Sequence, residues 1–262
     1  MPTDRKRKNE KLKTKSKKQI EQVTISQNSD AKSSGIDDVP EVQEVEELLL
    51  QQLKKAVHQN DIENSMWQLI SFYSRTERQE IAFNYVNKLV ERMDDPDRAA
   101  ECYLAMGQLM EQMRDYGSAI EYYEQASLLE PTERRVAYLV NNNLGYCLNC
   151  FGRYEEAEAY CRKAITIDPE RHNAYKNLGI SLEGQEHIGD AAKSYIRAVQ
   201  ANANDPRALM HLENLIENYP LIIATMGIVT NIQEQIEDCR KAVKAANDLR
   251  MKISEDENKC ST

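Results

Sequence analysis

The sequence predicts an all-α fold, an α-solenoid built from antiparallel helix hairpins. Of the 262 residues only 9 are Gly and 7 are Pro, too few for the many turns of an all-β chain. Hydrophobic residues make up 41% and charged residues 29%, a composition typical of a chain with a buried core. A helical pattern also recurs at intervals of 34 to 38 residues, and such periods indicate a solenoid.

Residues 1–40 are predicted to form a disordered basic and polar tail, because they contain too few large apolar residues to offset the entropy of ordering. From Met1 to Gln19 the formal charge is +7, against -16 for the rest and -9 overall. Such a tail either makes weak contacts with nucleic acid or anionic lipid or only adds solubility. IEQVTISQNSD follows the basic run where a secretory signal needs an apolar stretch, which favours a cytoplasmic protein.

Residues 41–99 are predicted to begin the folded body with one helix and a degenerate hairpin. The first helix has apolar residues at three- and four-residue steps, among them Val42, Val45, Leu49 and Leu53. The hairpin that follows is expected to have a turn one residue short. Its apolar positions are Trp67, Ile70, Ala82, Val86 and Leu89.

Residues 100–205 contain three clear hairpins. Each second helix has an Ala, a larger residue four positions on and another Ala three positions further: Ala119, Tyr123 and Ala126; Ala157, Cys161 and Ala164; Ala191, Tyr195 and Ala198. The first helices contain Gly107, Gly145 and Gly179. Small residues let two helices approach closely, and larger ones fill the groove between them. The interval of 38 residues between the first two units predicts about one extra turn on the first helix of the second hairpin.

Residues 206–251 are predicted to form a degenerate repeat and a long helix from Pro220 to Met251, followed by a disordered tail over 252–262. The long helix has an apolar seam: Ile222, Val229, Ile232, Ile236, Cys239, Val243 and Ala246. A terminal helix that caps the solenoid explains this seam; pairing with a second copy, which gives a homo-oligomer, is the alternative. The most apolar run, Leu221 to Val229, is shorter than the roughly 20 residues that span a bilayer, so no membrane insertion is expected.

The chain from Ala100 to about Pro206 resembles the tetratricopeptide-repeat (TPR) family, on the three glycines and the three Ala pairs given above. The resemblance implies a TPR superhelix that binds another protein, as an adaptor or co-chaperone, by holding an extended segment in its concave groove. Structural self-assembly through the C-terminal helix and recruitment to nucleic acid through the basic tail are the alternatives.

The resemblance also implies where a partner binds. In the family, an Asn just before the Leu-Gly pair often faces the groove and pins a peptide backbone, and Asn143 and Asn177 occupy that position. The alternative is that these are solvated residues of the repeat without a role. The candidate groove residues are Asn142, Asn143, Tyr146, Asn173, Lys176, Asn177, Arg207 and His211.

The family's carboxylate clamp, in which Lys, Arg and Asn hold a partner's C-terminal carboxylate, is mostly absent. In the frame of the three clear repeats its positions are occupied by Leu104, Gln108, Asn143, Asn173 and Asn177, and only Asn143 matches. One repeat further along they are occupied by Asn142, Tyr146, Asn177, Arg207 and His211, which keep one Asn and one cation. A ligand other than the tails of heat-shock chaperones is therefore expected.

The sequence offers no sign of catalysis, and we predict a protein that is not an enzyme and has neither cofactor nor metal. No nucleophile motif, phosphate loop or carboxylate pair is present. Cys147, Cys150 and Cys161 supply three thiols where structural zinc takes four ligands. The six cysteines are more simply interpreted as reduced thiols, which fits a cytoplasmic location.

Overall fold

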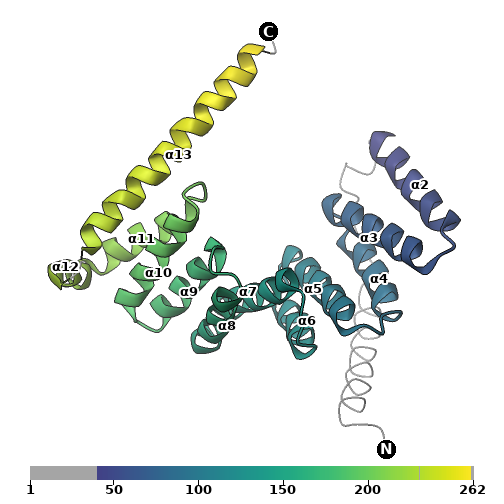
Figure 1. Ribbon diagram of the computed structural model, residues 1–262, viewed down its shortest axis with the longest axis horizontal. Coiled ribbons are helices and arrows are strands. Elements are labelled where there is room, and N and C mark those ends of the chain that lie inside the picture. The colour runs from purple at the N-terminus through teal and green to yellow at the C-terminus, as the bar shows by residue number, and fades with distance from the viewer. Residues whose placement is uncertain (1–39, 230, 261–262) are drawn as a thin grey trace, which may run out of the picture. The chain divides into compact units, whose positions relative to one another are not determined.

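The computed structural model describes residues 40–229 and 231–260, which form helices joined by short turns (Figure 1). The all-α prediction is confirmed. The predicted tail lies outside the described residues, except for Pro40, which begins the first helix. The helices are α2 (Pro40–Lys55), α3 (Gln59–Arg75), α4 (Gln79–Val90), α5 (Pro96–Gln112), α6 (Tyr116–Leu128), α7 (Arg134–Cys150), α8 (Tyr154–Ile167), α9 (His172–Gly184), α10 (Ile188–Ala201), α11 (Arg207–Asn218), α12 (Pro220–Val229) and α13 (Ile232–Cys260).

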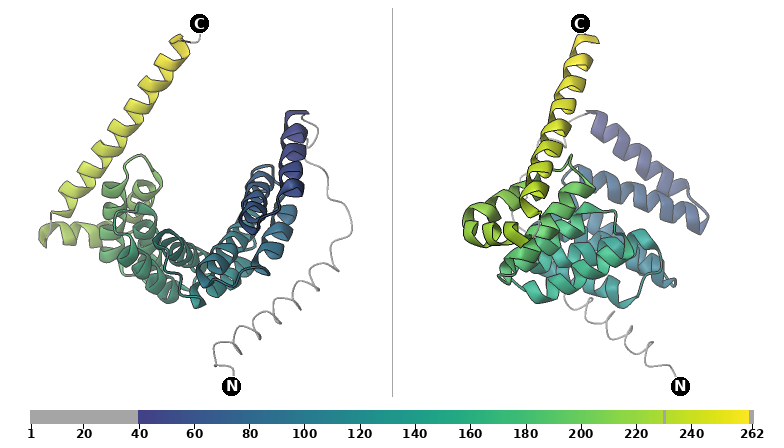
Figure 2. Two further views of the ribbon diagram at one scale, coloured as in Figure 1. Left: turned by 45° about the vertical axis from the view of Figure 1, so that its right-hand side comes forward. Right: turned by 60° about the vertical axis from the view of Figure 1, so that its left-hand side comes forward.

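The chain divides into a unit that ends at Val45 and a unit that begins at Glu46, and the second contains every helix from α3 onward. Within it, α3 and α4, α5 and α6, α7 and α8, and α9 and α10 pack as hairpins (Figure 2). The first helices α5, α7, α9 and α11 also contact one another in succession. We call these four helices the first-helix layer.

Close packing inside each hairpin follows the small-residue pattern of the sequence. A Cβ added to Gly107 would lie 2.4 Å from the ring of Tyr123, and one added to Gly179 would lie 2.4 Å from the ring of Tyr195. In the hairpin of α7 and α8, a Cβ on Gly145 would lie 2.6 Å from Sγ of Cys161. The three glycines therefore make the space that the larger residue of the second helix fills.

The turns inside the hairpins share a backbone conformation. Each has three residues, and the middle one has a left-handed φ: 58° at Glu77, 61° at Arg114, 70° at Gly152 and 62° at Glu186. The expectation of a shorter first turn is wrong. Ile70 lies as far before Ala82 as Gly107 lies before Ala119, so Ile70 takes the place of the glycine.

The first helix of the second clear hairpin is one turn longer than that of the third, as the repeat interval predicts, and equals that of the first. Helix α7 has 17 residues and its equivalent α9 has 13. The side chain of Glu133 accepts hydrogen bonds from the backbone N–H groups of Arg135 and Val136 and caps the added turn at its N-terminus.

The C-terminal region differs from the expected single helix. The chain forms α12 and then α13, whose first turn has a hydrogen bond of 2.5 Å from Gln235 Nε2 to Asn231 Oδ1. Helix α13 continues beyond Met251 to Cys260, because this stretch lacks Gly and Pro and is rich in charged residues that tolerate a helix. Residues 261–262 of the expected tail lie outside the described part.

The predicted apolar seam packs largely against its own chain. Ile232, Ile236, Cys239 and Val243 are buried in a cluster formed with α10 and α11, as expected for a cap. Ile222 is 44% exposed and the adjoining Ile223 is buried in its place. In the described part of the chain, no helix combines the length and apolarity needed to cross a bilayer.

Candidate partner-binding surface

The eight candidate residues lie on three helices of the first-helix layer that contact one another in order. Helix α7 carries three of them, α9 three and α11 two. In the same order they are Asn142, Asn143 and Tyr146, then Asn173, Lys176 and Asn177, then Arg207 and His211. Their side chains differ in burial and in the hydrogen bonds that they make within the protein.

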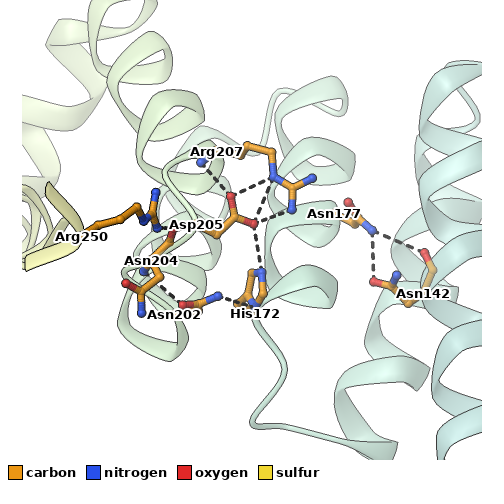
Figure 3. Close-up of polar contacts among 8 residues, drawn as sticks. All are labelled: Asn142, His172, Asn177, Asn202, Asn204, Asp205, Arg207 and Arg250. Carbon is orange, nitrogen blue, oxygen red and sulfur yellow. Dashed lines mark hydrogen bonds and ion pairs between the residues drawn. The ribbon is translucent and has the colours of Figure 1, made fainter. Parts of the chain in front are cut away.

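Asn142 and Asn177 are buried and bonded to each other. Asn177 Nδ2 donates to Asn142 Oδ1 at 3.1 Å and to the Asn142 carbonyl at 3.4 Å (Figure 3). The two residues are only 7% and 2% exposed. Asn177 Oδ1 is buried and lacks a hydrogen-bond partner within the described residues. The amide donor of Asn177 therefore joins α9 to α7, and this residue cannot pin a peptide by the donor and acceptor together.

Asn149 and Ser181, which the sequence analysis missed, extend this link. Asn149 Nδ2 donates to the Asn177 carbonyl at 2.8 Å, and Ser181 Oγ donates to Asn149 Oδ1 at 2.9 Å. All of these groups are buried between α7 and α9. Asn149 follows Asn142 by seven residues and Ser181 follows Asn177 by four, so helical periodicity places them on the same sides as the predicted pair.

Asn143 belongs to a second polar group with Tyr123 and Glu111. Asn143 Nδ2 donates to Tyr123 Oη at 3.3 Å, and the Tyr123 hydroxyl donates to Glu111 Oε2 at 2.8 Å. Burial raises the pKa of Glu111, although the hydrogen bond from Tyr123 acts in the opposite direction. Asn143 is only partly buried, and its Oδ1 accepts a hydrogen bond from Asn142 Nδ2 at 3.0 Å, which joins this group to the first.

Glu111 was also missed, although the repeat contains a signal for it. Glu183 precedes Tyr195 by the same interval at which Glu111 precedes Tyr123. The Tyr195 hydroxyl donates to Glu183 Oε2 at 2.7 Å. A paired acidic residue twelve positions before the tyrosine is therefore a property of both hairpins.

Arg207 lies at the start of α11 and is held by Asp205. Its Nε donates to Asp205 Oδ1 at 2.8 Å and its Nη2 lies 2.5 Å from Asp205 Oδ2 (Figure 3). Asp205 Oδ2 also lies 3.0 Å from Nε2 of His172. The hydrogen bonds from Arg207 hold the pKa of Asp205 well below its usual range.

Lys176 is a buried cation close to Arg207 and His211. It is only 8% exposed, its ammonium nitrogen is not among the fully enclosed atoms, and it makes no hydrogen bond or ion pair within the described residues. Burial lowers the pKa of Lys176, and the charge of Arg207 lowers it further. Burial also lowers the pKa of His211, as do the charges of Lys176 and Arg207.

The aromatic members of the surface are partly buried. The ring of His211 stacks on the ring of Tyr195, with centroids 5.4 Å apart and an interplanar angle of 12°. Tyr146 makes an edge contact with Tyr116 at 6.0 Å. Asn173 is partly exposed. The described residues include no group of three His, Cys, Asp or Glu side chains placed to hold a metal ion.

Sequence profiles of the tetratricopeptide repeat match residues 100–133 and 139–171. These are the first two of the clear hairpins, because each match begins inside the first helix, α5 or α7, and ends just after the second, α6 or α8. The chain contains tetratricopeptide repeats. Stacked hairpins of this kind are typical of protein-interaction scaffolds.

This TPR protein is similar in sequence to curated proteins over part of their length. It is 25% identical over 121 residues to the Hsp70-Hsp90 organising protein of Plasmodium falciparum. The aligned region makes up 44% of this chain and 46% of that protein. It is 26% identical over 135 residues to the BBSome complex member BBS4 of Mus musculus, covering 52% of this chain and 24% of that protein. The chain therefore spans less than half the length of these relatives.

Solved structures show the same fold. BtubC from P. vanneervenii superposes with a TM-score of 0.59 at 15% identity, covering 85% of this chain and 93% of that one. MamA from Desulfovibrio magneticus superposes with a TM-score of 0.53 at 16% identity, covering 72% of this chain and 96% of that one. At these identities the likeness of the TPR protein to both structures concerns the fold alone.

Proposed function

We propose that this TPR protein is an adaptor or co-chaperone that binds an extended segment of another protein along its first-helix layer. The observation that carries the proposal is that Asn143, Tyr146, Lys176, Arg207 and His211 lie on three contacting first helices. A peptide that crosses these helices meets an amide, an aromatic ring and cations in turn. The expected concave groove remains part of this proposal.

The partial likeness to the Hsp70-Hsp90 organising protein supports the co-chaperone role. The clamp positions favour a ligand other than a chaperone tail, because Leu104 and Gln108 replace two of the residues expected there. Non-catalytic action and a cytoplasmic location complete the proposal. The buried and unpaired thiols of Cys102, Cys147 and Cys161 fit a reducing compartment.

Affinity capture from the native source with the full-length protein tests the proposal. Because Asn142 and Asn177 hold α7 to α9, the test variant spares them and combines Asn143→Ala, Tyr146→Ala, Lys176→Met and Arg207→Gln. A matched control changes the second helices instead, with Tyr160→Ala, Lys163→Met and Arg197→Gln. The partner should be lost from the first variant and kept by the control. A partner that both variants retain would move the binding surface away from the first-helix layer.

Self-assembly through α13 is a second candidate, favoured by apolar side chains beyond the buried seam. Leu249, Met251 and Ile253 are 61%, 59% and 52% exposed. Light scattering on the full-length protein and on a Leu249→Glu, Met251→Glu variant tests it. A dimer that the variant loses supports the candidate, whereas a monomer at high concentration removes it.

Recruitment to nucleic acid or anionic lipid through the basic tail is a weaker proposal, because residues 1–39 lie outside the described part. Retention on nucleic acid and on anionic vesicles at low salt should fall when Met1 to Gln19 is deleted. Unchanged retention on both would end this proposal.

A further inference from the structure

Lys176 is a buried cation whose charge is not balanced by an ion pair. The residue is more than nine-tenths buried, but its ammonium nitrogen is not among the fully enclosed atoms and can be reached from solvent. The described residues provide this nitrogen with no hydrogen bond or ion pair. Buried charges in proteins are normally paired, because the loss of hydration is otherwise uncompensated. The lowered pKa of Lys176 reflects this desolvation.

The acidic side chains around Lys176 are already occupied. Glu111 accepts the hydrogen bond from Tyr123, and Asp205 is held by Arg207 and His172. Both carboxyl groups act on Lys176 electrostatically without reaching ion-pair distance. Glu183, which acts on His211, accepts a hydrogen bond from Tyr195. Cys161, the remaining neighbour, is a buried thiol whose pKa burial raises to about 12, so it is neutral at physiological pH.

The neighbouring basic side chains add to the positive charge at this place. Arg207 lies on α11 and disfavours the charged form of Lys176, and the two together disfavour the charged form of His211. Arg207 is well exposed and uses Nε and Nη2 for Asp205. A carboxylate placed here would gain the unpaired ammonium group as its main partner, with Arg207 beside it.

We propose that the segment bound by the first-helix layer presents an internal Asp or Glu side chain to Lys176, beside Arg207. This inference rests on the proposed function and adds the chemistry of the ligand. A side chain is favoured over a C-terminal carboxylate because Lys176 lies on α9, with contacting first helices on both sides. A segment that crosses all of them continues in both directions past Lys176.

Selection of peptides tests the inference without a known partner. A library of random twelve-residue peptides displayed with blocked C-termini is panned on the full-length wild type, on Lys176→Met and on Lys193→Met. Lys193 is a matched control, because it is an exposed lysine on the second helix α10. Peptides enriched on the wild type and the control should share one Asp or Glu that Lys176→Met no longer selects.

The outcomes separate this inference from the proposed function. Enriched peptides without a shared acidic position, or the same acidic position selected by Lys176→Met, would refute the inference and leave the proposed function standing. Failure to enrich any peptide on the wild type would count against both. Dependence of a synthetic version on a free C-terminus would also refute the inference.

A second measurement guards against a merely structural effect of the substitution. Replacing the shared Glu or Asp of a C-terminally amidated peptide by its amide should weaken binding to the wild type at least about tenfold. On Lys176→Met the two peptides should bind equally, and Arg207→Gln should reduce the difference. The pKa of Lys176, followed by NMR of its side chain, should rise when the acidic peptide binds. An unchanged pKa, or an amide effect as large on Lys176→Met, would refute the pairing.

Discussion

At the scale of single residues, the close contact of Gly179 with Tyr195 can be tested by adding a methyl group at Gly179. The Gly179→Ala methyl group would lie 2.4 Å from the ring, and the ring is fixed by its hydrogen bond to Glu183 and its stacking on His211. We expect a loss of about 1–3 kcal/mol in the free energy of unfolding, measured by urea denaturation.

The matched control for this substitution is Gly117→Ala. Gly117 lies in α6, and an added Cβ would meet no atom closer than 3.6 Å. Because alanine favours helix more than glycine, this variant should be as stable as the wild type or slightly more stable, by up to about 1 kcal/mol. Equal losses at both positions would contradict the close-packing explanation.

The buried amide of Asn149 provides a second residue-scale prediction. Asn149→Ala removes two buried hydrogen bonds, one to the Asn177 carbonyl and one from the Ser181 hydroxyl, and leaves only the direct bond from Ser181 Oγ to the Asn177 carbonyl at 3.0 Å. We expect a loss of about 1–3 kcal/mol in unfolding free energy. Asn173→Ala, at a partly exposed position on α9, should change it by less than about 0.5 kcal/mol. A loss below that limit for Asn149→Ala would show that the link between α7 and α9 is not stabilising.

Asp205 makes stability depend on pH in a defined direction. Its pKa in the folded protein lies below the ordinary 3.8, so its contribution is present above about pH 4 and is lost as pH falls further. Asp205→Asn should lower stability at neutral pH by about 1.5–3 kcal/mol, because it removes the charged partner of Arg207. The difference between the two proteins should shrink as pH falls from 4 to 2.

Urea denaturation at several pH values measures this difference. Glu111 has a raised pKa, so its contribution is lost as pH rises, but it is common to both proteins and cancels. Asp238→Asn, at an exposed position on α13, serves as the control and should stay close to the wild type. A constant difference between wild type and Asp205→Asn across this pH range would contradict the assignment.

At the scale of elements, the left-handed residue in each hairpin turn can be tested in both directions. Gly152→Ala places a side chain at a φ of 70° and should destabilise the protein by about 1–2 kcal/mol. Glu186→Gly removes the side chain from the same left-handed conformation in the next hairpin. It should raise the free energy of unfolding by on the order of 0.5–1 kcal/mol. Thermal and urea denaturation of both variants should therefore give shifts of opposite sign. Shifts of the same sign would mean that side-chain contacts outweigh backbone strain.

The sequence predicted the clear hairpins because their positions are fixed by local packing. The spacing from Gly107 to Ala119 recurs in each unit, and the extra turn of α7 follows from the longer interval. The end of α13 was missed because the apolar seam that indicated the helix ends at Ala246, although nothing in the residues after Met251 breaks a helix. The division between α12 and α13 was also missed, because the apolar seam continues across it from Ile222 to Ile232 without a helix-breaking residue pair.

For the candidate surface, the sequence predicted the helix on which each residue lies but not which side chains are buried. Repeat alignment assigned all eight residues to first helices, and they lie there. It did not tell Asn177, which faces α7 and is nearly inaccessible, from Asn143, which is partly exposed. Helical periodicity gives a side of the helix, whereas the tilt between adjoining repeats decides which polar side chain is enclosed. The unpaired state of Lys176 likewise required distances.

At the scale of the whole molecule, the hydrophobic core is divided into clusters that each span neighbouring hairpins. One cluster joins α3, α4 and α5, a second joins α5 to α8, and a third extends from Cys161 on α8 to α13. A small fourth cluster of Tyr138, Ala164 and Ala174 joins α7, α8 and α9. Unfolding is therefore expected to depart from a two-state transition, because each hairpin packs mainly against its neighbours along the chain.

Leu144→Ala tests this division of the core. Leu144 is fully buried in the second cluster. The substitution should lower the free energy of unfolding of this cluster by about 2–5 kcal/mol. Hydrogen exchange of backbone amides should accelerate in α5 to α8 and stay nearly unchanged in α11 and α13. Uniform acceleration along the chain would indicate one cooperative core instead.

The succession of hairpins that contact only near neighbours also determines how the protein responds to force. A tension applied at the two ends acts on one interface between hairpins after another, so each can give way separately. Every 34-residue hairpin released would lengthen the chain by up to about 110–120 Å. A partner bound across α7, α9 and α11 would join three such units, and they would then rupture together at a higher force.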